Sequence, residues 1–166
     1  MGKLDGKIAL ITGSSNGIGL ATAQRFVAEG VEHVFIVARG QEALDEAVRT
    51  IGAKNVTAVQ GDVSNMADLD KVVQRDSERE KGRLDILFAN AGGGKIATLG
   101  SIAEKQFDDE VNVNLKGVLF TVQKALPLFV DEGSIILNAS ICAVKGSPGL
   151  SVYSATKVAV RSFARC

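Results

Sequence analysis

Short apolar runs alternate along the chain with longer segments in which apolar residues recur every three or four positions. Five of the short runs are rich in valine and isoleucine and show no polar alternation, which is typical of strands covered on both faces. The expected strands are Ile8 to Ile11, Val34 to Ala38, Val56 to Val59, Leu84 to Ala89 and Ile135 to Leu137.

The intervening segments carry the periodicity of amphipathic helices. Gln41 to Ile51, for example, places Leu44, Ala47 and Val48 on one face. The other expected helices are Ile18 to Ala28, Met66 to Lys81, a segment through Phe107, Leu115 to Phe129, and a last helix from near Val152. Ser64 and Asn65 are candidate caps before Met66, and Ser101 with Glu104 forms a capping box before Phe107. Pro127 is expected at the frayed end of the Leu115 to Phe129 helix.

Strands that alternate with helices predict right-handed crossovers and a parallel sheet with helices on both faces, a three-layer α/β/α arrangement. The 166 residues fit one domain by length. The run Gly92-Gly93-Gly94 follows the fourth expected strand, where the loops of such a sheet face a ligand.

Composition narrows the classes of partner. Nineteen basic and nineteen acidic residues cancel, so no charge pattern favours nucleic acid or a membrane surface. The chain has one histidine, His33, and two cysteines, Cys142 and Cys166, without paired spacing. We therefore expect no metal site and no disulfide framework, and the absence of an apolar leader predicts a cytoplasmic protein.

A glycine loop joins the first expected strand to the first expected helix. Its sequence is Thr12-Gly13-Ser14-Ser15-Asn16-Gly17-Ile18-Gly19. Glycine permits a sharp turn and a close backbone approach to a pyrophosphate, and the amides at a helix N-terminus attract negative charge. The loop predicts a nucleotide site, although an ordinary tight turn into a helix has the same form.

The single tyrosine, Tyr153, stands four residues before Lys157, so the two side chains share a helix face. A free tyrosine, with a pKa of about 10, is a reluctant acid or base at neutral pH, and a nearby cation favours its phenolate. Ser140 follows the fifth strand, 13 residues before Tyr153, where its hydroxyl can hold a substrate oxygen. Each residue alone also fits a plain structural role, but the ordered set indicates carbonyl or alcohol redox chemistry.

These motifs together resemble the short-chain dehydrogenase/reductase family. Further matching segments are Gly61-Asp62-Val63, Ala89-Asn90-Ala91-Gly92 and Asn112-Val113-Asn114-Leu115-Lys116-Gly117, and the likeness runs from about Lys7 to Cys166. The resemblance implies a Rossmann-like doubly wound sheet and a catalytic tetrad of Asn114, Ser140, Tyr153 and Lys157.

The resemblance also implies roles in cofactor binding. Asp62 and Val63 hold the adenine ring, Asn90, Ala91 and Gly92 line the cleft, and Lys157 also binds the nicotinamide ribose. Asn114 supports a water that relays protons to the lysine. One position departs from the family motif, because Ala89 replaces its first asparagine and weakens a backbone-bracing contact.

The residue after the second strand bears on the cofactor. Arg39 lies 20 positions beyond Gly19, and the place of an acid that would select NAD is taken by Ala38. A guanidinium there binds the additional phosphate of NADP, so we expect NADP(H) to be favoured over NAD(H). A solvated surface arginine is the alternative, and Asn16 supplies no second cation where many NADP-preferring relatives have one.

Family members usually continue with two more strands and a lid over the substrate, so we expect 1–166 to be a single dinucleotide-binding domain that is C-terminally incomplete. The expected activity is interconversion of a ketone and a secondary alcohol; the alternative is a truncated nucleotide-binding or partner-binding protein without turnover.

The fifth strand is expected to form an exposed sheet edge. Cys142 could line the substrate pocket or act as a small buried apolar residue. A homodimer or homotetramer is expected through the two late helices, with Val118, Leu119, Val122 and Leu126 as contacts.

Overall fold

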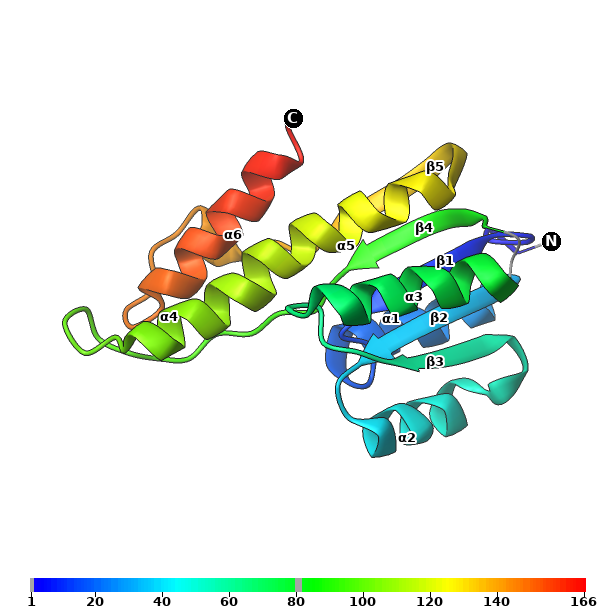
Figure 1. Cartoon of the computed structure of the whole chain (residues 1–166), viewed down its shortest axis with the longest axis horizontal. Coiled ribbons are helices and arrows are strands. Elements are labelled where there is room, and N and C mark those ends of the chain that lie inside the picture. Colours follow the sequence, from blue (N-terminus) through cyan, green and yellow to red (C-terminus); the bar gives the residue numbers. More distant parts are fainter. Residues whose placement is uncertain (1, 80–81) are drawn as a thin grey trace.

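A five-stranded parallel sheet organises the molecule. The computed structural model describes residues 2–79 and 82–166, and its strands follow the order β3-β2-β1-β4-β5 (Figure 1). Their bounds are Ile8–Thr12 for β1, His33–Ala38 for β2, Val56–Gln60 for β3, Leu84–Ala89 for β4 and Phe129–Leu137 for β5. The strand order reverses direction between β1 and β4, as in a doubly wound fold.

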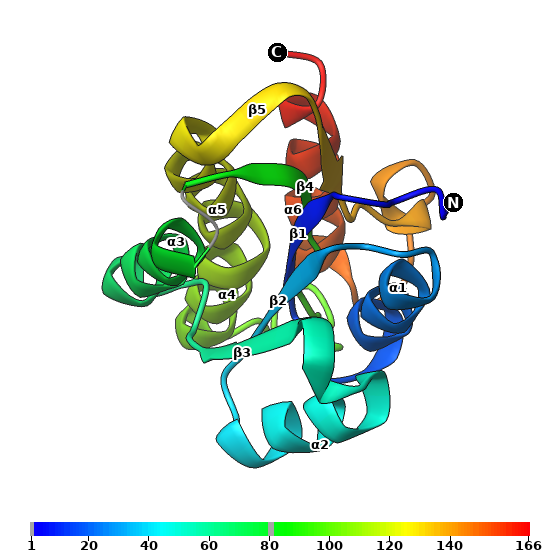
Figure 2. The same ribbon diagram turned by 90° about the vertical axis from the view of Figure 1, so that its right-hand side faces the viewer.

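Helices cover both faces of this sheet (Figure 2). One side carries α1 and α2, and the other carries α3 and α5. The helix bounds are Gly17–Ala28 for α1, Gln41–Ile51 for α2, Met66–Arg79 for α3, Glu104–Val111 for α4, Val118–Ala125 for α5 and Ser151–Phe163 for α6. The expected three-layer Rossmann-like fold is therefore confirmed.

Successive side chains of the central strands enter two separate cores. Ala9 and Ile11 of β1 pack with the α1 and α2 layer, whereas Ile8 and Leu10 pack with the α3 and α5 layer. All five β1 residues are buried. A strand buried on both faces has no polar side to display, and this explains the continuous apolar run.

The edge strand β5 differs from its expected form. It starts at Phe129 instead of Ile135, and its first part includes Glu132 in the left-handed region at φ 66°. Because β5 pairs only with β4 at the end of the sheet, Ile135 and Ile136 remain 40% and 41% exposed. The exposed edge expected from the sequence is thus present.

The second half of the chain corrects two expectations about helices. The capping box of Ser101 and Glu104 is wrong, because α4 begins at Glu104 after Ala103 and the Ser101 hydroxyl donates to Thr98 O. The two helices expected around Phe107 and from Leu115 are joined without a break. A π-helical turn, Asn112–Gly117, links α4 to α5, and Pro127 lies in the final 3-10 turn as expected.

The start of α3 agrees with its expected cap. The Asn65 side-chain oxygen accepts hydrogen bonds from the amides of Ala67 and Asp68. This satisfies donors in the first helical turn. The expected end of that helix at Lys81 lies outside the described residues.

Asp85 of β4 should make stability sensitive to acid. Its buried carboxylate accepts hydrogen bonds from Ile8 N at 3.0 Å, Arg83 at 3.1 Å and Lys7 at 3.2 Å. Burial acts to raise the pKa of Asp85, but these donors and cations outweigh it and lower the pKa below its usual value. The resulting stability is complete above the unfolded pKa of about 3.9 and is lost as the pH falls through the folded pKa.

We therefore expect Asp85→Asn to flatten the decline in unfolding free energy below about pH 4, because it removes the group that titrates. Chemical denaturation at several pH values measures this slope. The exposed Asp108→Asn is the matched control. An Asp85→Asn slope equal to that of the parent protein would contradict the assignment.

Candidate active site

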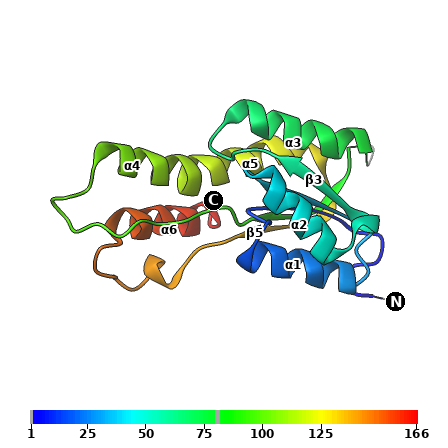
Figure 3. The same cartoon turned by 90° about the horizontal axis from the view of Figure 1, so that it is seen from below.

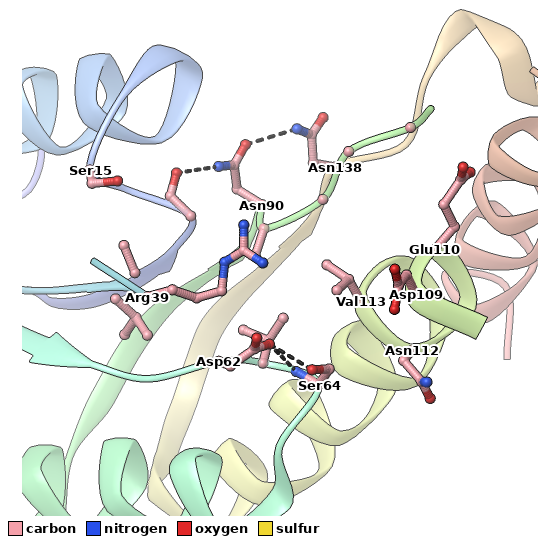
Figure 4. Close-up of a pocket in the computed structure, with 18 of the residues that line it drawn as sticks. Ser15, Arg39, Asp62, Ser64, Asn90, Asp109, Glu110, Asn112, Val113 and Asn138 are labelled. Carbon is pink, nitrogen blue, oxygen red and sulfur yellow. Dashed lines mark hydrogen bonds between the residues drawn. The ribbon is translucent and has the colours of Figure 1, made fainter. Parts of the chain in front are cut away.

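An open pocket of about 1070 Å³ lies where the five strands of the sheet end. Loops from these strands and the first turns of α1 surround it, and α4 and α6 extend beyond the sheet beside it (Figure 3). Such a crevice, at the point where the strand order reverses, is where open α/β sheets bind ligands. The residues labelled in Figure 4 surround this space and come from the ends of the strands, the glycine loop, α4 and the turn after α4.

The glycine loop has the close approaches that its sequence predicts. Gly13 has a φ of 66°, and a Cβ on Gly19 would lie 2.3 Å from Gly13 O. Neither position accepts a side chain without movement of the backbone. The amino end of α1 therefore reaches the pocket as bare backbone, with its free amides available to an anion.

The loop residues divide between the pocket and the sheet. Ser14 is fully buried, and its hydroxyl donates to Ile11 O at 2.7 Å and accepts from Val37 N at 2.9 Å. Ser14 thus ties the loop to β1 and β2 rather than facing a ligand. The loop residues that line the pocket are Gly13, Ser15, Asn16 and Ile18.

One end of the pocket is marked by Arg39 and Asp62. Arg39 follows β2, and its exposed side chain extends into the pocket (Figure 4). Among the described residues, no hydrogen bond or ion pair engages its guanidinium group. The Asp62 carboxylate accepts from Ser64 N at 2.9 Å and from Ser64 Oγ at 2.7 Å, which fixes its direction. Val63, also in the lining, is buried.

Tyr153 and Lys157 lie one turn apart on α6 and both line the pocket. The Lys157 Nζ stands 5.6 Å from the centre of the Tyr153 ring and donates to Asn138 O at 2.7 Å. Lys157 is only 3% exposed. Burial lowers the pKa of its ammonium group. The expected proximity of phenol and ammonium is thus present.

Asn114 is fully buried in the π-helical turn, a feature that often marks functional sites. Its Oδ1 accepts from Gly93 N at 3.0 Å and its Nδ2 donates to Gly93 O at 2.7 Å. A Cβ on Gly92 would lie 3.0 Å from Asn114 Oδ1 and 3.3 Å from Lys157 Nζ. Gly92 therefore leaves room for the side chains of both Asn114 and Lys157.

Ser140, like Asn114, is a tetrad candidate that does not belong to the pocket lining. Its Oγ accepts from Cys142 N at 3.1 Å, and the described part of the chain shows no hydrogen bond between Ser140 and Tyr153. Cys142 is also outside the lining. Hydrogen bonds from Ser147 and then Ser140 lower the pKa of the Cys142 thiol.

Asn138 is a pocket residue that the sequence reasoning missed. Its Nδ2 donates to Asn90 Oδ1 at 2.8 Å, and Asn90 Nδ2 donates to Gly13 O at 3.0 Å. Because Asn138 O also accepts from Lys157, a hydrogen-bonded chain runs from the glycine loop to α6. A polar residue directly after the apolar run of β5 was the available signal.

The lowered pKa of Lys157 gives stability a measurable pH dependence. The folded chain binds this proton less readily than the unfolded chain, so raising the pH favours folding. Between neutral pH and about 10.4, the unfolding free energy of the parent should rise relative to that of Lys157→Met. Denaturation curves across this range test it, with the exposed Lys145→Met as control. A difference that stays constant with pH would contradict it.

No cluster of three histidine, cysteine, aspartate or glutamate side chains in residues 2–79 and 82–166 could hold a metal ion. Within the same residues, no helix has the length and apolar character needed to cross a membrane.

The sequence and fold were compared with known proteins. A family model described as short chain dehydrogenase matches residues 7–166. Oxidoreductase asL5 of Sarocladium schorii is 48% identical over 165 residues, covering 98% of this chain and 65% of that protein. Versicolorin reductase 1 of Aspergillus parasiticus is 36% identical over 167 residues, covering 99% of this chain and 63% of that protein. The chain thus spans slightly less than two thirds of these two relatives.

Solved structures share the fold at high similarity. L-Sorbose reductase from Gluconobacter frateurii, complexed with NADPH and L-sorbose, superposes with a TM-score of 0.89 and 35% identity over 98% of this chain and 63% of that one. A short chain dehydrogenase/reductase from Burkholderia phymatum in complex with NAD gives a TM-score of 0.91 and 29% identity over 99% of this chain and 60% of that one.

Proposed function

Because this chain belongs to the short-chain dehydrogenase/reductase family, we propose that it interconverts a ketone and a secondary alcohol with NADP(H), within one dinucleotide-binding domain. The observation that carries the proposal is the pair of Tyr153 and Lys157 in the lining of a pocket that also contains the glycine loop. The named reductases among the relatives support the reaction class.

The glycine loop, Arg39 and Lys157 would hold a nicotinamide cofactor, which would provide the hydride for the carbonyl carbon. The Tyr153 hydroxyl donates its proton to the carbonyl oxygen in reduction and accepts it in oxidation. The Lys157 ammonium, 5.6 Å from the ring centre, stabilises the phenolate that remains. Lys157 also binds the ribose of the cofactor, and Asn114 holds the wall formed by Gly93 behind them.

Ser140 completes the proposed tetrad by orienting the substrate oxygen beside Tyr153. Its hydroxyl oxygen accepts from Cys142 N, and its hydroxyl group also lowers the pKa of the Cys142 thiol through a hydrogen bond, so a substrate oxygen would have to replace the thiol as its acceptor. This role requires Ser140 to reach the pocket when substrate is present. The position of Ser140 outside the lining also favours a second candidate, a nucleotide-binding protein without turnover.

The preference for NADP(H) rests on the end of β2. Arg39 extends into the pocket with its guanidinium free among the described residues, and Ala38 beside it offers no carboxylate. A free guanidinium is suited to a phosphate, with which it makes charge-assisted hydrogen bonds. Asp62 and Val63 line the same end and are proposed to hold the adenine.

Association through the late helices is also proposed, as a homodimer or homotetramer. Of the four expected contacts, Val118 and Val122 pack inside the chain, whereas Leu119 and Leu126 are 40% and 52% exposed. The exposed pair, seven residues apart, faces outward and could contact a second copy of the chain.

The free thiols of Cys142 and Cys166 fit the reducing environment of the cytoplasm, where we propose the protein works.

A panel of ketones with NADPH tests the proposed reaction, and a parallel titration measures the dissociation constant of the cofactor. Cofactor binding together with ketone-dependent NADPH oxidation by the protein in its natural length is the expected result. Tight binding without oxidation across the panel would instead support the candidate without turnover.

A further inference from the structure

A buried carboxylate at the end of α4 has no role in the proposed chemistry. Glu110 is 5% exposed, and its Oε1 accepts from Lys95 N at 3.0 Å and from Gln106 Nε2 at 3.1 Å. Its Oε2 is buried and has no hydrogen-bond partner among the described residues. Burying a carboxylate is costly unless its hydrogen bonds are satisfied, so the position calls for an explanation.

The contacts of Glu110 continue those of Asn114, four residues later. Asn114 binds both the N–H and the carbonyl of Gly93, and Glu110 binds the N–H of Lys95. The two side chains thus hold both ends of the short segment Gly93–Lys95 against the helix. We call this pair of contacts the loop clamp. Glu110 is one of the α4 residues in the pocket lining, and it is labelled in Figure 4.

The residue held between the two contacts lies against Tyr153. A Cβ on Gly94 would stand 2.8 Å from Tyr153 Cδ2, 2.9 Å from Cγ and 3.0 Å from Cβ. Real Cβ contacts are not that short, so only glycine leaves the ring in its place. The backbone of Gly94 therefore packs directly against one side of the phenol ring.

We propose that Glu110 is a positioning residue, which through the loop clamp sets the Tyr153 ring where its hydroxyl meets the substrate. The catalytic importance of that position rests on the proposed function of Tyr153. Without the bond from Lys95 N, this end of the segment keeps the hydrogen bond from Gln106 Nε2 to Lys95 O at 3.1 Å and the exposed Lys95–Asp109 ion pair. The Lys95 amide is then no longer fixed, and Gly94 can move away from the ring. A displacement of about 1 Å can cost on the order of a hundredfold in rate.

The composition of the chain supplies a selective probe. Tyr153 is the only tyrosine and there is no tryptophan, so protein with isotope-labelled tyrosine rings gives one set of ring signals in an NMR spectrum. This readout reports the ring environment without requiring turnover. The amide signal of Lys95 reports directly on the bond to Glu110. Failure of the positioning role is therefore distinguishable from failure of the proposed reaction.

Three variants of Glu110 separate the contact from its charge. Glu110→Asp keeps the charge but is one methylene too short to reach Lys95 N, and Glu110→Leu removes the acceptor. Glu110→Gln removes the charge and keeps an oxygen that can accept from Lys95 N. Glu104→Asp is the matched control, because Glu104 is exposed on the first turn of the same helix. Gly94→Ala shows that the probe responds, since its Cβ must displace the ring.

We expect the Tyr153 ring signals to shift or broaden in Glu110→Asp, Glu110→Leu and Gly94→Ala, and to match the parent in Glu110→Gln and Glu104→Asp. If Glu110→Leu does not fold, Glu110→Asp decides the result. The proposal is overturned if folded Glu110→Asp keeps the parent ring signals while Gly94→Ala moves them. It is equally overturned if Glu110→Gln shifts the ring as far as Glu110→Asp, because charge would then be responsible.

Discussion

Tyr153→Phe should remove nearly all turnover while leaving the dissociation constant of NADP(H) almost unchanged. The substitution deletes the hydroxyl proposed to transfer the proton and keeps the ring that rests on Gly94. General acid–base catalysis typically contributes about 10² to 10⁴ in rate, so kcat should fall by at least about a hundredfold. The measurement is steady-state reduction of a ketone, with cofactor affinity determined by calorimetry on the same preparation.

A comparison with Lys157→Met separates the two roles proposed for the pair. Because Lys157 is proposed to serve both the tyrosine and the ribose, its replacement should lower kcat and weaken cofactor binding together. Retention of substantial turnover by Tyr153→Phe would show that another group transfers the proton.

Arg39→Asp should reverse the cofactor preference. The parent is expected to bind NADP(H) more tightly than NAD(H), because the exposed guanidinium of Arg39 extends into the pocket. A hydrogen bond to a charged group is worth about 1.5–3 kcal/mol, so losing it should weaken NADP(H) binding about tenfold to a hundredfold. The introduced carboxylate repels the additional phosphate and accepts from the ribose hydroxyls, so the affinity for NAD(H) should rise.

The control is Arg49→Asp, which makes the same charge change on the exposed face of α2, where Arg49 pairs with Glu46. It should leave both affinities near those of the parent. Calorimetric titration of each variant with both dinucleotides decides the matter. Equal affinity of the parent for NADP(H) and NAD(H) would contradict the role of Arg39.

Local patterns in the sequence were sufficient for the sheet and the principal motifs. The strands β1, β2 and β4 follow from their apolar runs, since burial on both faces favours apolar side chains at most positions. The pairing of Tyr153 with Lys157 follows from helical spacing alone. In each case the determining contacts lie within one element or between neighbouring layers.

The contacts that the sequence did not predict join residues far apart in the chain. Glu110 and Lys95 are 15 residues apart, and Asn138 and Asn90 are 48 apart. No spacing rule within a helix or strand encodes such a pair.

The early part of β5 was missed for another reason. Asp131, Glu132 and Gly133 interrupt its apolar pattern, which an exposed edge strand tolerates.

The central claim is that a nicotinamide dinucleotide binds beside Tyr153 and Lys157. It is tested most directly by following the ring signals of the single tyrosine while NADP⁺ is added to the 166-residue chain. We predict a saturable shift whose midpoint agrees with the dissociation constant from calorimetry, and we predict that Lys157→Met weakens both. Saturable binding in calorimetry that leaves the Tyr153 signals unmoved would place the nucleotide elsewhere and contradict the claim.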